Sequence, residues 1–259
     1  MIIPFKLLMP FLAIFCLLTF SVKGQENPNT PAPFIKHFNG TVTATNNGIS
    51  LIPSFSLGRP AVFFDLSVGG ERLSFDPMFR FGMNGKPWSF IFWWRYKVIK
   101  DKKFTFSAGA HPAFIFTEKD VMVDGKPEKM LVAQRFIAME LAPNFRISPK
   151  TTIGFYFLKG HGLNPIPPNN SNFLAFNTVF NDLPLVKDFR IRINPQFYYL
   201  KVDENDGTYI TSSFTITNKK YPISIQSIFN QKIKSSIAGQ DLVWNVSLLY
   251  SFANKYQKQ

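Results

Sequence analysis

In several segments of this sequence the charged side chains fall on one set of alternate residues, and alternate residues of a β-strand lie on the same face. In segments 72–82 and 86–98 that face carries Asp76, Arg80 and Arg95. Acids and arginines gathered in a pore select solutes by sign and size, whereas in a narrower space they pair into a salt-bridge network. Both interpretations remain open. The residues predicted to share this inner face are Asp65, Asp76, Arg80, Arg95, His111, Gln134, Glu140, Arg146, Arg190, Arg192, Asn194 and Gln196.

The predicted inner face is positively charged, because its arginines outnumber its acids. Such a lining favours anions, for example sugar acids or phosphates. We expect Arg95, Arg190 and Arg192 to form the constriction, since all three fall on the inner phase of long strands.

Enzyme chemistry receives little support from the residue types. A nucleophile needs a base and an orienting group within hydrogen-bond reach. The histidines are His37, His111 and His161, in a lead-in, on the inner face and in a loop respectively. A lipid-modifying enzyme would need a serine or acid beside a histidine on the outer face, and the alternation places none there. We therefore predict that the protein is not an enzyme.

Metal and cofactor sites are not predicted either. The only cysteine is Cys16, and no histidines are paired at ligand spacing. The acids Asp203, Glu204 and Asp206 do not complete a calcium-loop signature, so they are interpreted as a solvated turn. No glycine-rich phosphate loop is present, and we predict no cofactor.

The first 24 residues read as a secretory signal peptide. Lys6 precedes an apolar run from 7 to 20, and small residues lead to an expected cleavage after Gly24. An uncleaved anchor helix is the alternative, although the run is short for one. Removing 1–24 lowers the net charge from +13 to +11 and removes Cys16, so disulfides are not expected. Because the chain is expected to be exported, nucleic acid is not predicted as a partner despite the basic composition.

The rest of the chain alternates between apolar and polar residues with almost no helical periodicity. Many segments run nine to sixteen residues, longer than the roughly five or six of soluble strands and matching the about 9–11 that cross a bilayer. The expected strands are 49–57, 61–69, 72–82, 86–98, 103–116, 131–147, 151–160, 172–181, 187–201, 207–218, 221–231 and 240–252.

These strands predict an all-β fold, a single transmembrane antiparallel β-barrel of twelve strands. Ten or fourteen strands remain possible, since 38–45 could join the sheet. The predicted organisation is a periplasmic lead-in at 25–48, the barrel at 49–252 and a periplasmic tail at 253–259. Short turns are expected to alternate with longer outer loops such as 117–130 and 161–171.

Aromatic rows decide which face should meet lipid. Trp88, Phe90, Phe92, Trp94 and Tyr96 alternate along one strand, and a barrel interior of this size cannot hold many such rows. Charged residues make up only 17% of the chain, against roughly 25% in soluble domains. We therefore expect the aromatic rows to face lipid, with Trp88 and Trp244 in one interfacial girdle and Trp94, Tyr96, Tyr250 and Phe252 in the other.

Prolines within the expected strands oppose regular pairing, because proline cannot donate to the ladder. Each falls on the outward row, so bulges or kinks are predicted at Pro53, Pro77, Pro112, Pro143 and Pro195.

Two stretches resemble a family of outer-membrane β-barrel proteins of Bacteroidota, a porin-like family without a settled activity. They are GISLIPSFSLGRPAVFFDL (48–66) and KPWSFIFWWRY (86–96). The last strand ends its apolar row on Phe252, which resembles the C-terminal signal of such barrels, although ANKYQKQ follows. The resemblance implies a Gram-negative outer membrane and no particular activity.

The function predicted from these observations is a passive channel for small hydrophilic solutes with mild anion preference. The alternative is a non-conducting structural or accessory barrel that binds a partner. Outer-membrane lipid and lipopolysaccharide are the other expected partners, with Arg135 on the lipid row placed to meet lipopolysaccharide phosphates.

Overall fold

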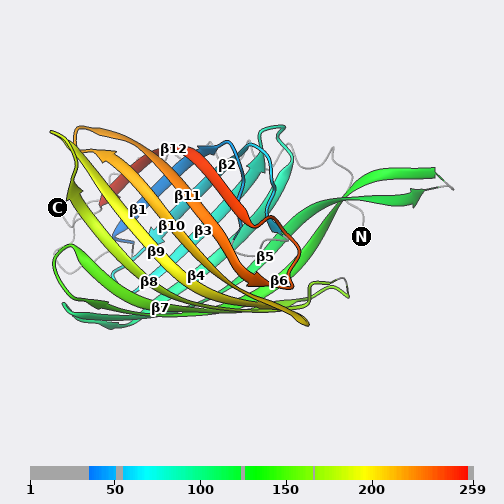
Figure 1. Cartoon of the computed structure of the whole chain (residues 1–259), viewed down its shortest axis with the longest axis horizontal. Coiled ribbons are helices and arrows are strands. Elements are labelled where there is room, and N and C mark those ends of the chain that lie inside the picture. The colour runs from blue at the N-terminus through cyan, green and yellow to red at the C-terminus, as the bar shows by residue number, and fades with distance from the viewer. Residues whose placement is uncertain (1–34, 51–54, 124–125, 166, 256–259) are drawn as a thin grey trace, which may run out of the picture. The chain divides into compact units, whose positions relative to one another are not determined.

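The computed structural model describes residues 35–50, 55–123, 126–165 and 167–255. Its strands close into one antiparallel barrel in which each strand pairs with its neighbours in sequence and β1 pairs with β12 (Figure 1). The predicted twelve-stranded barrel is confirmed. The strands are β1 (His37–Thr45), β2 (Ala61–Gly69), β3 (Leu73–Gly82), β4 (Pro87–Lys100), β5 (Phe104–Val123), β6 (Lys126–Arg146), β7 (Thr151–Gly162), β8 (Asn170–Pro184), β9 (Phe189–Val202), β10 (Asn205–Asn218), β11 (Tyr221–Ser235) and β12 (Leu242–Lys255).

Among the described residues, no helix is both long enough and apolar enough to cross a membrane.

The first predicted strand is wrong, although the other eleven overlap the observed ones. Of the segment 49–57, the described residues at 49–50 and 55–57 are not in a strand, and the barrel starts instead with β1 at His37. β12 likewise continues to Lys255. The barrel therefore begins inside the predicted lead-in and ends inside the predicted tail. The predicted signal peptide lies outside the described residues.

The pairing of β1 with β12, which closes the barrel, explains why the outward row of β1 is only weakly apolar. Its outward row includes Gly40, which pairs with Phe252 of β12. The ring of Phe252 lies so close to Gly40 that a Cβ there would collide with it, and it also contacts Phe38 with 5.5 Å between ring centroids. An aromatic ring from β12 thus covers the outer surface that β1 leaves bare, a known means of stabilising a glycine in a strand.

The expected long loop at 117–130 is wrong, because β5 and β6 continue their pairing through it. Their register runs without a shift from Phe104↔Phe145 to Val123↔Lys126. The ribbon of the two strands projects beyond the rest of the barrel (Figure 1). The sequence signal was the Asp-Gly pair at 124–125, since this dipeptide favours a two-residue hairpin turn.

The prolines interrupt pairing without shifting it. Each of the prolines Pro77, Pro112, Pro143 and Pro195 is paired with one neighbouring strand. On the other side its own rung and an adjacent one are missing, while the register is the same on both sides of the gap. Of the predicted bulges or kinks, the bulges do not occur at these four positions, because a missing N–H interrupts pairing without requiring an extra residue. Pro53 lies outside the described residues.

A register shift occurs instead beside Trp88. Arg80 pairs with Ser89 and Phe81 pairs with Pro87, so Trp88 is an extra residue on β4. The bulge turns its side chain into the barrel, where it is 3% exposed and donates a 2.7 Å hydrogen bond from Nε1 to the carbonyl of Phe55. The prediction that Trp88 belongs to an outer girdle is wrong, since a bulge inverts the phase that alternation assumes.

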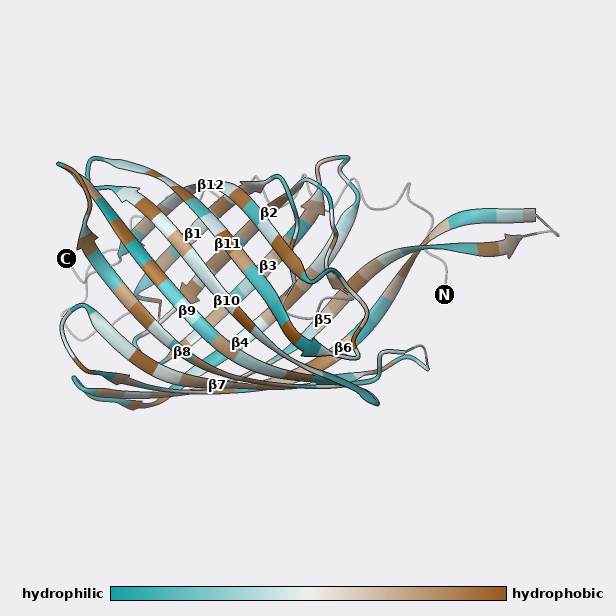
Figure 2. Ribbon diagram, in the orientation of Figure 1, coloured by the Kyte–Doolittle hydropathy of each residue, from teal (hydrophilic) through white to brown (hydrophobic). Residues whose placement is uncertain are grey.

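Elsewhere the predicted phase matches the structure. Hydrophilic and hydrophobic residues alternate along the strands (Figure 2), and the exposed large side chains include Trp94, Trp244, Leu248 and Tyr250. On β4, the alternate residues Ser89, Ile91, Trp93 and Arg95 line the interior. Burial of polar rows and exposure of apolar rows is the pattern of a barrel in lipid.

The two ends of the barrel differ. We call the end that holds His37 and Lys255 the terminal rim, and the end where β5 and β6 project the hairpin rim. The main apolar cluster lies inside the barrel toward the hairpin rim, and the connection from β1 to β2 contacts it through Phe55. Its members are Phe173, Ala175, Tyr198, Leu200, Val202, Tyr209 and Ile237.

Candidate functional site

A hollow of about 800 Å³ opens at the terminal rim, and we call it the terminal chamber. Strands β1 to β5 and β12 supply its wall, because their inner rows converge there. Its charged side chains are six cations and two acids. They are Lys36, Arg72, Arg95, Lys97, Lys100 and Lys255, with Glu71 and Asp76.

The acids of the chamber are paired, but not all of its cations are. Glu71 lies 2.9 Å from Lys36 and 3.2 Å from Lys100, and these hydrogen bonds lower the pKa of Glu71 to about 2. Within the described chain, no carboxylate pairs with Arg72, Lys97 or Lys255. The chamber consequently carries a surplus of positive charge.

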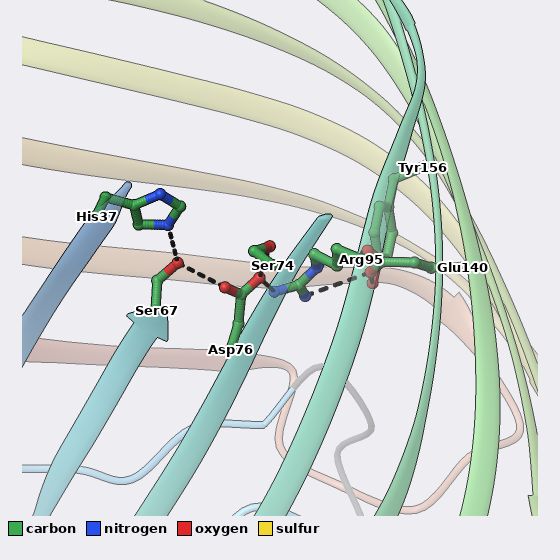
Figure 3. Close-up of polar contacts among 7 residues, drawn as sticks. All are labelled: His37, Ser67, Ser74, Asp76, Arg95, Glu140 and Tyr156. Atoms are coloured by element: carbon green, nitrogen blue, oxygen red, sulfur yellow. Dashed lines mark hydrogen bonds and ion pairs between the residues drawn. The ribbon is translucent and has the colours of Figure 1, made fainter. Parts of the chain in front are cut away.

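A row of hydrogen-bonded side chains leads from the chamber around the barrel wall, and we call it the polar belt (Figure 3). Its members are His37, Ser67, Ser74, Asp76, Arg95, Glu140 and Tyr156. Its first centre is Asp76 on β3. This carboxylate accepts hydrogen bonds from Ser67 at 2.6 Å, from Ser74 at 3.1 Å and from Nη1 of Arg95 at 3.0 Å. Asp76 thereby joins three neighbouring strands, β2 to β4.

The second centre of the polar belt is Glu140 on β6, which is 3% exposed. It accepts 2.6 Å hydrogen bonds from Nε of Arg95 and from the hydroxyl of Tyr156 on β7. Arg95 also lies over the ring of Trp93, 4.4 Å from its centroid. One guanidinium therefore bridges two carboxylates, which gives each buried charge a partner.

The polar belt contains a serine, a histidine and an aspartate, but not in a catalytic order. Ser67 donates its single hydroxyl proton to Asp76, so in the 3.1 Å contact with Nε2 of His37 the serine oxygen is the acceptor. In a hydrolytic triad the serine donates to the histidine and the acid orients the histidine. Here the serine proton is directed to the acid, so the arrangement does not activate a nucleophile.

A second hollow, of about 230 Å³, lies among strands β3 to β8, and we call it the aromatic cavity. Trp88, Trp93, Phe55 and Phe136 contribute to its wall. His111 also lines it, with its ring centroid 4.0 Å from that of Trp93. Because Arg95 lines both this cavity and the terminal chamber, it stands between the two.

A third hollow, the polar cavity of about 420 Å³, lies against β1, β2 and β9 to β12. Asp65 and Arg80 line it together with hydroxyl and amide side chains. Arg80 also lines the aromatic cavity. The aromatic cavity thus shares Arg95 with the terminal chamber and Arg80 with the polar cavity.

The structure does not bring the predicted constriction together. Arg190 lies 3.4 Å from Asp182 and donates to the carbonyls of Lys187 and Phe189. Arg192 donates to Asn181 at 3.1 Å. Neither lines any of the three hollows above. The end of β8 supplies the side-chain partners of both arginines, Asp182 and Asn181, and strand phase alone does not reveal these contacts.

Other predicted residues occupy separate places. Arg146 lines a small hollow with Lys102 and Lys103 near the terminal rim. Gln196 donates to Asn194 on its own strand at 3.0 Å, and Gln134 is buried near the carbonyl of Pro167.

The acidic turn after β9 is used within the fold. Asp203 accepts hydrogen bonds from the backbone N–H groups of Asn169 and Asn170. In the described ranges, no group of three or more His, Cys, Asp or Glu side chains is arranged to hold a metal ion.

Solved structures resemble this barrel, although at low sequence identity. An outer membrane channel from Pseudomonas putida F1 superposes with a TM-score of 0.50 at 8% identity, covering 89% of this chain and 100% of the channel. The KdgM porin in complex with disordered oligogalacturonate gives 0.48 at 10% identity, covering 83% and 99%. OmpT of Vibrio cholerae without loop L8 gives 0.41 at 7% identity, covering 84% and 99%.

The chain has the fold of an outer-membrane β-barrel. At such identity the likeness concerns the fold alone. No family model matches the sequence, and no curated protein matches it.

Sequence reasoning missed part of the polar belt. His37 was assigned to the lead-in, and Ser67, Ser74 and Tyr156 were not singled out. Ser67, Ser74 and Tyr156 lie on inner rows that alternation did predict, so phase was the available signal. Strand phase could not distinguish these three residues from the other inward residues, because their role depends on hydrogen-bond partners on other strands.

Proposed function

We propose that the protein is an outer-membrane barrel through which small hydrophilic anions diffuse passively. The observation that carries this proposal is the terminal chamber, in which six cations face two acids. A basic vestibule with low-dielectric walls concentrates anions and raises their rate of entry. Sugar acids and phosphates are the solute classes that match this charge.

The chamber cations without a carboxylate partner, Arg72, Lys97 and Lys255, are the residues proposed to select the solute by its charge. A surplus of one sign of charge at the entrance to a pore favours solutes of the opposite sign. Arg95 lines the inner end of the chamber, where Asp76 and Glu140 hold its guanidinium in place. Arg190 and Arg192 take no part in this proposal.

The test is planar-bilayer recording of the purified protein in a KCl gradient. We expect conductance steps and a reversal potential on the anion-selective side. Lys97→Glu reverses one unpaired chamber charge and should shift the reversal potential toward cations. Lys159→Glu makes the same change on the outer row of β7 and should leave it unshifted. Absence of conductance in the unaltered protein would overturn the proposal.

Export and location form the second part of the proposal. Residues 1–24 act as a signal peptide, and the barrel resides in a Gram-negative outer membrane, as its exposed apolar rows and its resemblance to Bacteroidota barrels favour. Arg135 lies on the exposed row, where it would meet lipopolysaccharide phosphates. Cell fractionation with N-terminal sequencing should find the protein in outer membranes, starting at Gln25. A chain retaining 1–24 would contradict the cleavage.

We also propose that the protein is not an enzyme, on the ground that Ser67 donates to Asp76 and not to His37. Esterase and phospholipase assays on the purified protein should show no activity that Ser67→Ala removes.

One observation favours a second function, a non-conducting accessory barrel. Toward the hairpin rim the interior holds the apolar cluster around Phe173 and Leu200, which are almost fully buried. A sealed barrel would show no conductance, and its partner would be sought by cross-linking in native membranes.

A further inference from the structure

The aromatic cavity holds three buried polar atoms that have no hydrogen-bond partner among the described residues. They are Nε of Arg80, Oγ of Ser89 and Nδ1 of His111. Ser89 is 4% exposed and His111 is 7% exposed. Nearly all buried polar groups in proteins are hydrogen-bonded, so such a cluster indicates a missing water or ligand.

Arg80 is the cation available to a ligand. Arg95 lines the same cavity but is already paired with Asp76 and Glu140. In the described part of the chain, no ion pair joins Arg80 to a carboxylate, and Asp65 keeps an unpartnered oxygen of its own. The guanidinium lies 5.6 Å from the ring centroid of Trp88, which fixes its position over an aromatic face.

Arg80 on β3 and Ser89 on β4 are directly paired, so their side chains point into the cavity from adjacent positions. An arginine N–H can only donate, and a serine hydroxyl can donate as well. The group that satisfies both is therefore an acceptor. A carboxylate matches the planar donor fork of arginine best.

Most of the remaining lining is apolar, including Ile91, Trp93, Ile115 and Leu158, although Ser50, Tyr156 and Ser171 also contribute to it. The cavity measures about 230 Å³, and a cavity of about 150 Å³ already accepts benzene. A body of one ring with a short substituent therefore fits. A sugar fits less well, since few polar groups would meet its hydroxyls.

We propose that the aromatic cavity binds a small organic carboxylate with a ring-sized apolar body. The carboxylate accepts hydrogen bonds from Arg80 and Ser89, and the ring packs between Trp88 and Trp93. This site does not depend on conduction, because a sealed barrel with the same cavity would bind the same ligand.

The test uses the purified barrel in detergent micelles and two probes of equal shape, phenylacetate and the neutral phenylacetamide. Binding is followed by tryptophan fluorescence, since Trp88 and Trp93 line the cavity, and by calorimetry. We expect saturable binding of phenylacetate, about tenfold tighter than phenylacetamide, the ratio expected when a carboxylate replaces a neutral acceptor. No saturable binding of either probe, or equal affinity for both, would overturn the proposal.

Variants locate the site. Arg80→Met should weaken phenylacetate about tenfold and leave phenylacetamide unchanged. Ala113→Leu fills the cavity and should abolish both, whereas Ala110→Leu makes the same change on the exposed face of β5 and should affect neither. If Ala113→Leu does not fold, Ser89→Ala, which adds no volume, should still weaken phenylacetate. Wild-type affinity for phenylacetate in Arg80→Met would contradict the assignment.

Discussion

The two halves of the barrel are held together by different forces. Toward the terminal rim, the interior is a chamber of charges joined by the polar belt, with Arg95 bridging Asp76 and Glu140. Toward the hairpin rim, it is a packed cluster of aromatic and aliphatic side chains around Phe173. The first half contains a hollow and is held together by charge pairing, while the second half is filled and is held together by the packing of its side chains.

Phe173→Ala should have the largest effect, because it empties the packed half. Phe173 is 2% exposed, and truncating such a side chain costs about 4 kcal/mol of unfolding free energy through lost contacts and a cavity. Urea unfolding in micelles measures it. Phe176→Ala, on the exposed row of the same strand, is the control and should cost clearly less. Equal costs would mean that the hairpin half is not tightly packed.

Arg95→Met should rank second and tests the chamber half. It leaves Glu140 buried without its cation, which costs about 3 kcal/mol, and the same unfolding assay applies. The double variant Arg95→Met with Glu140→Gln should recover part of that loss, since the amide carries no charge to compensate. A single variant as stable as the unaltered protein would show that the polar belt does not stabilise the barrel.

Trp88→Phe probes how the β1–β2 connection is attached to the hairpin half. The change removes the hydrogen bond to the carbonyl of Phe55 and retains most of the ring, so it should cost about 1 kcal/mol. Proteolysis of the β1–β2 connection should become faster, because that bond attaches the connection to β4. Trp244→Phe on the outer face is the matched control and should leave the proteolysis rate unchanged.

Glu71→Gln should have the smallest effect, visible only in acid. The folded-state pKa of Glu71 is lowered to about 2 by Lys36 and Lys100, below its unfolded value of 4.5. Its contribution to stability is therefore present above pH 4.5 and is lost as pH falls toward 2. The variant should flatten the stability profile in that window, and an unchanged slope there would refute the pairing. The site is exposed, so salt should weaken the effect.

The contrast between the two halves of the barrel also explains which parts of the structure could be predicted from the sequence. Strand phase identified Asp76, Arg95 and Glu140 as inward residues, and the structure gathers them in the polar belt. It did not identify the aromatic cavity, because Trp88 enters it through a bulge that breaks the alternation. It also grouped Arg190 and Arg192 with Arg95, although contacts to Asp182 and Asn181 hold them elsewhere.

The sequence by itself determined the barrel, eleven of its strands and the side of each that meets lipid, because alternation is a local property that two neighbouring residues already express. Only the tertiary structure decided that β1 closes the barrel under Phe252, that Trp88 points inward and that one arginine serves two acids. Each of these features depends on contacts between strands that are distant in the chain, and a local sequence pattern does not specify which distant residues will be in contact.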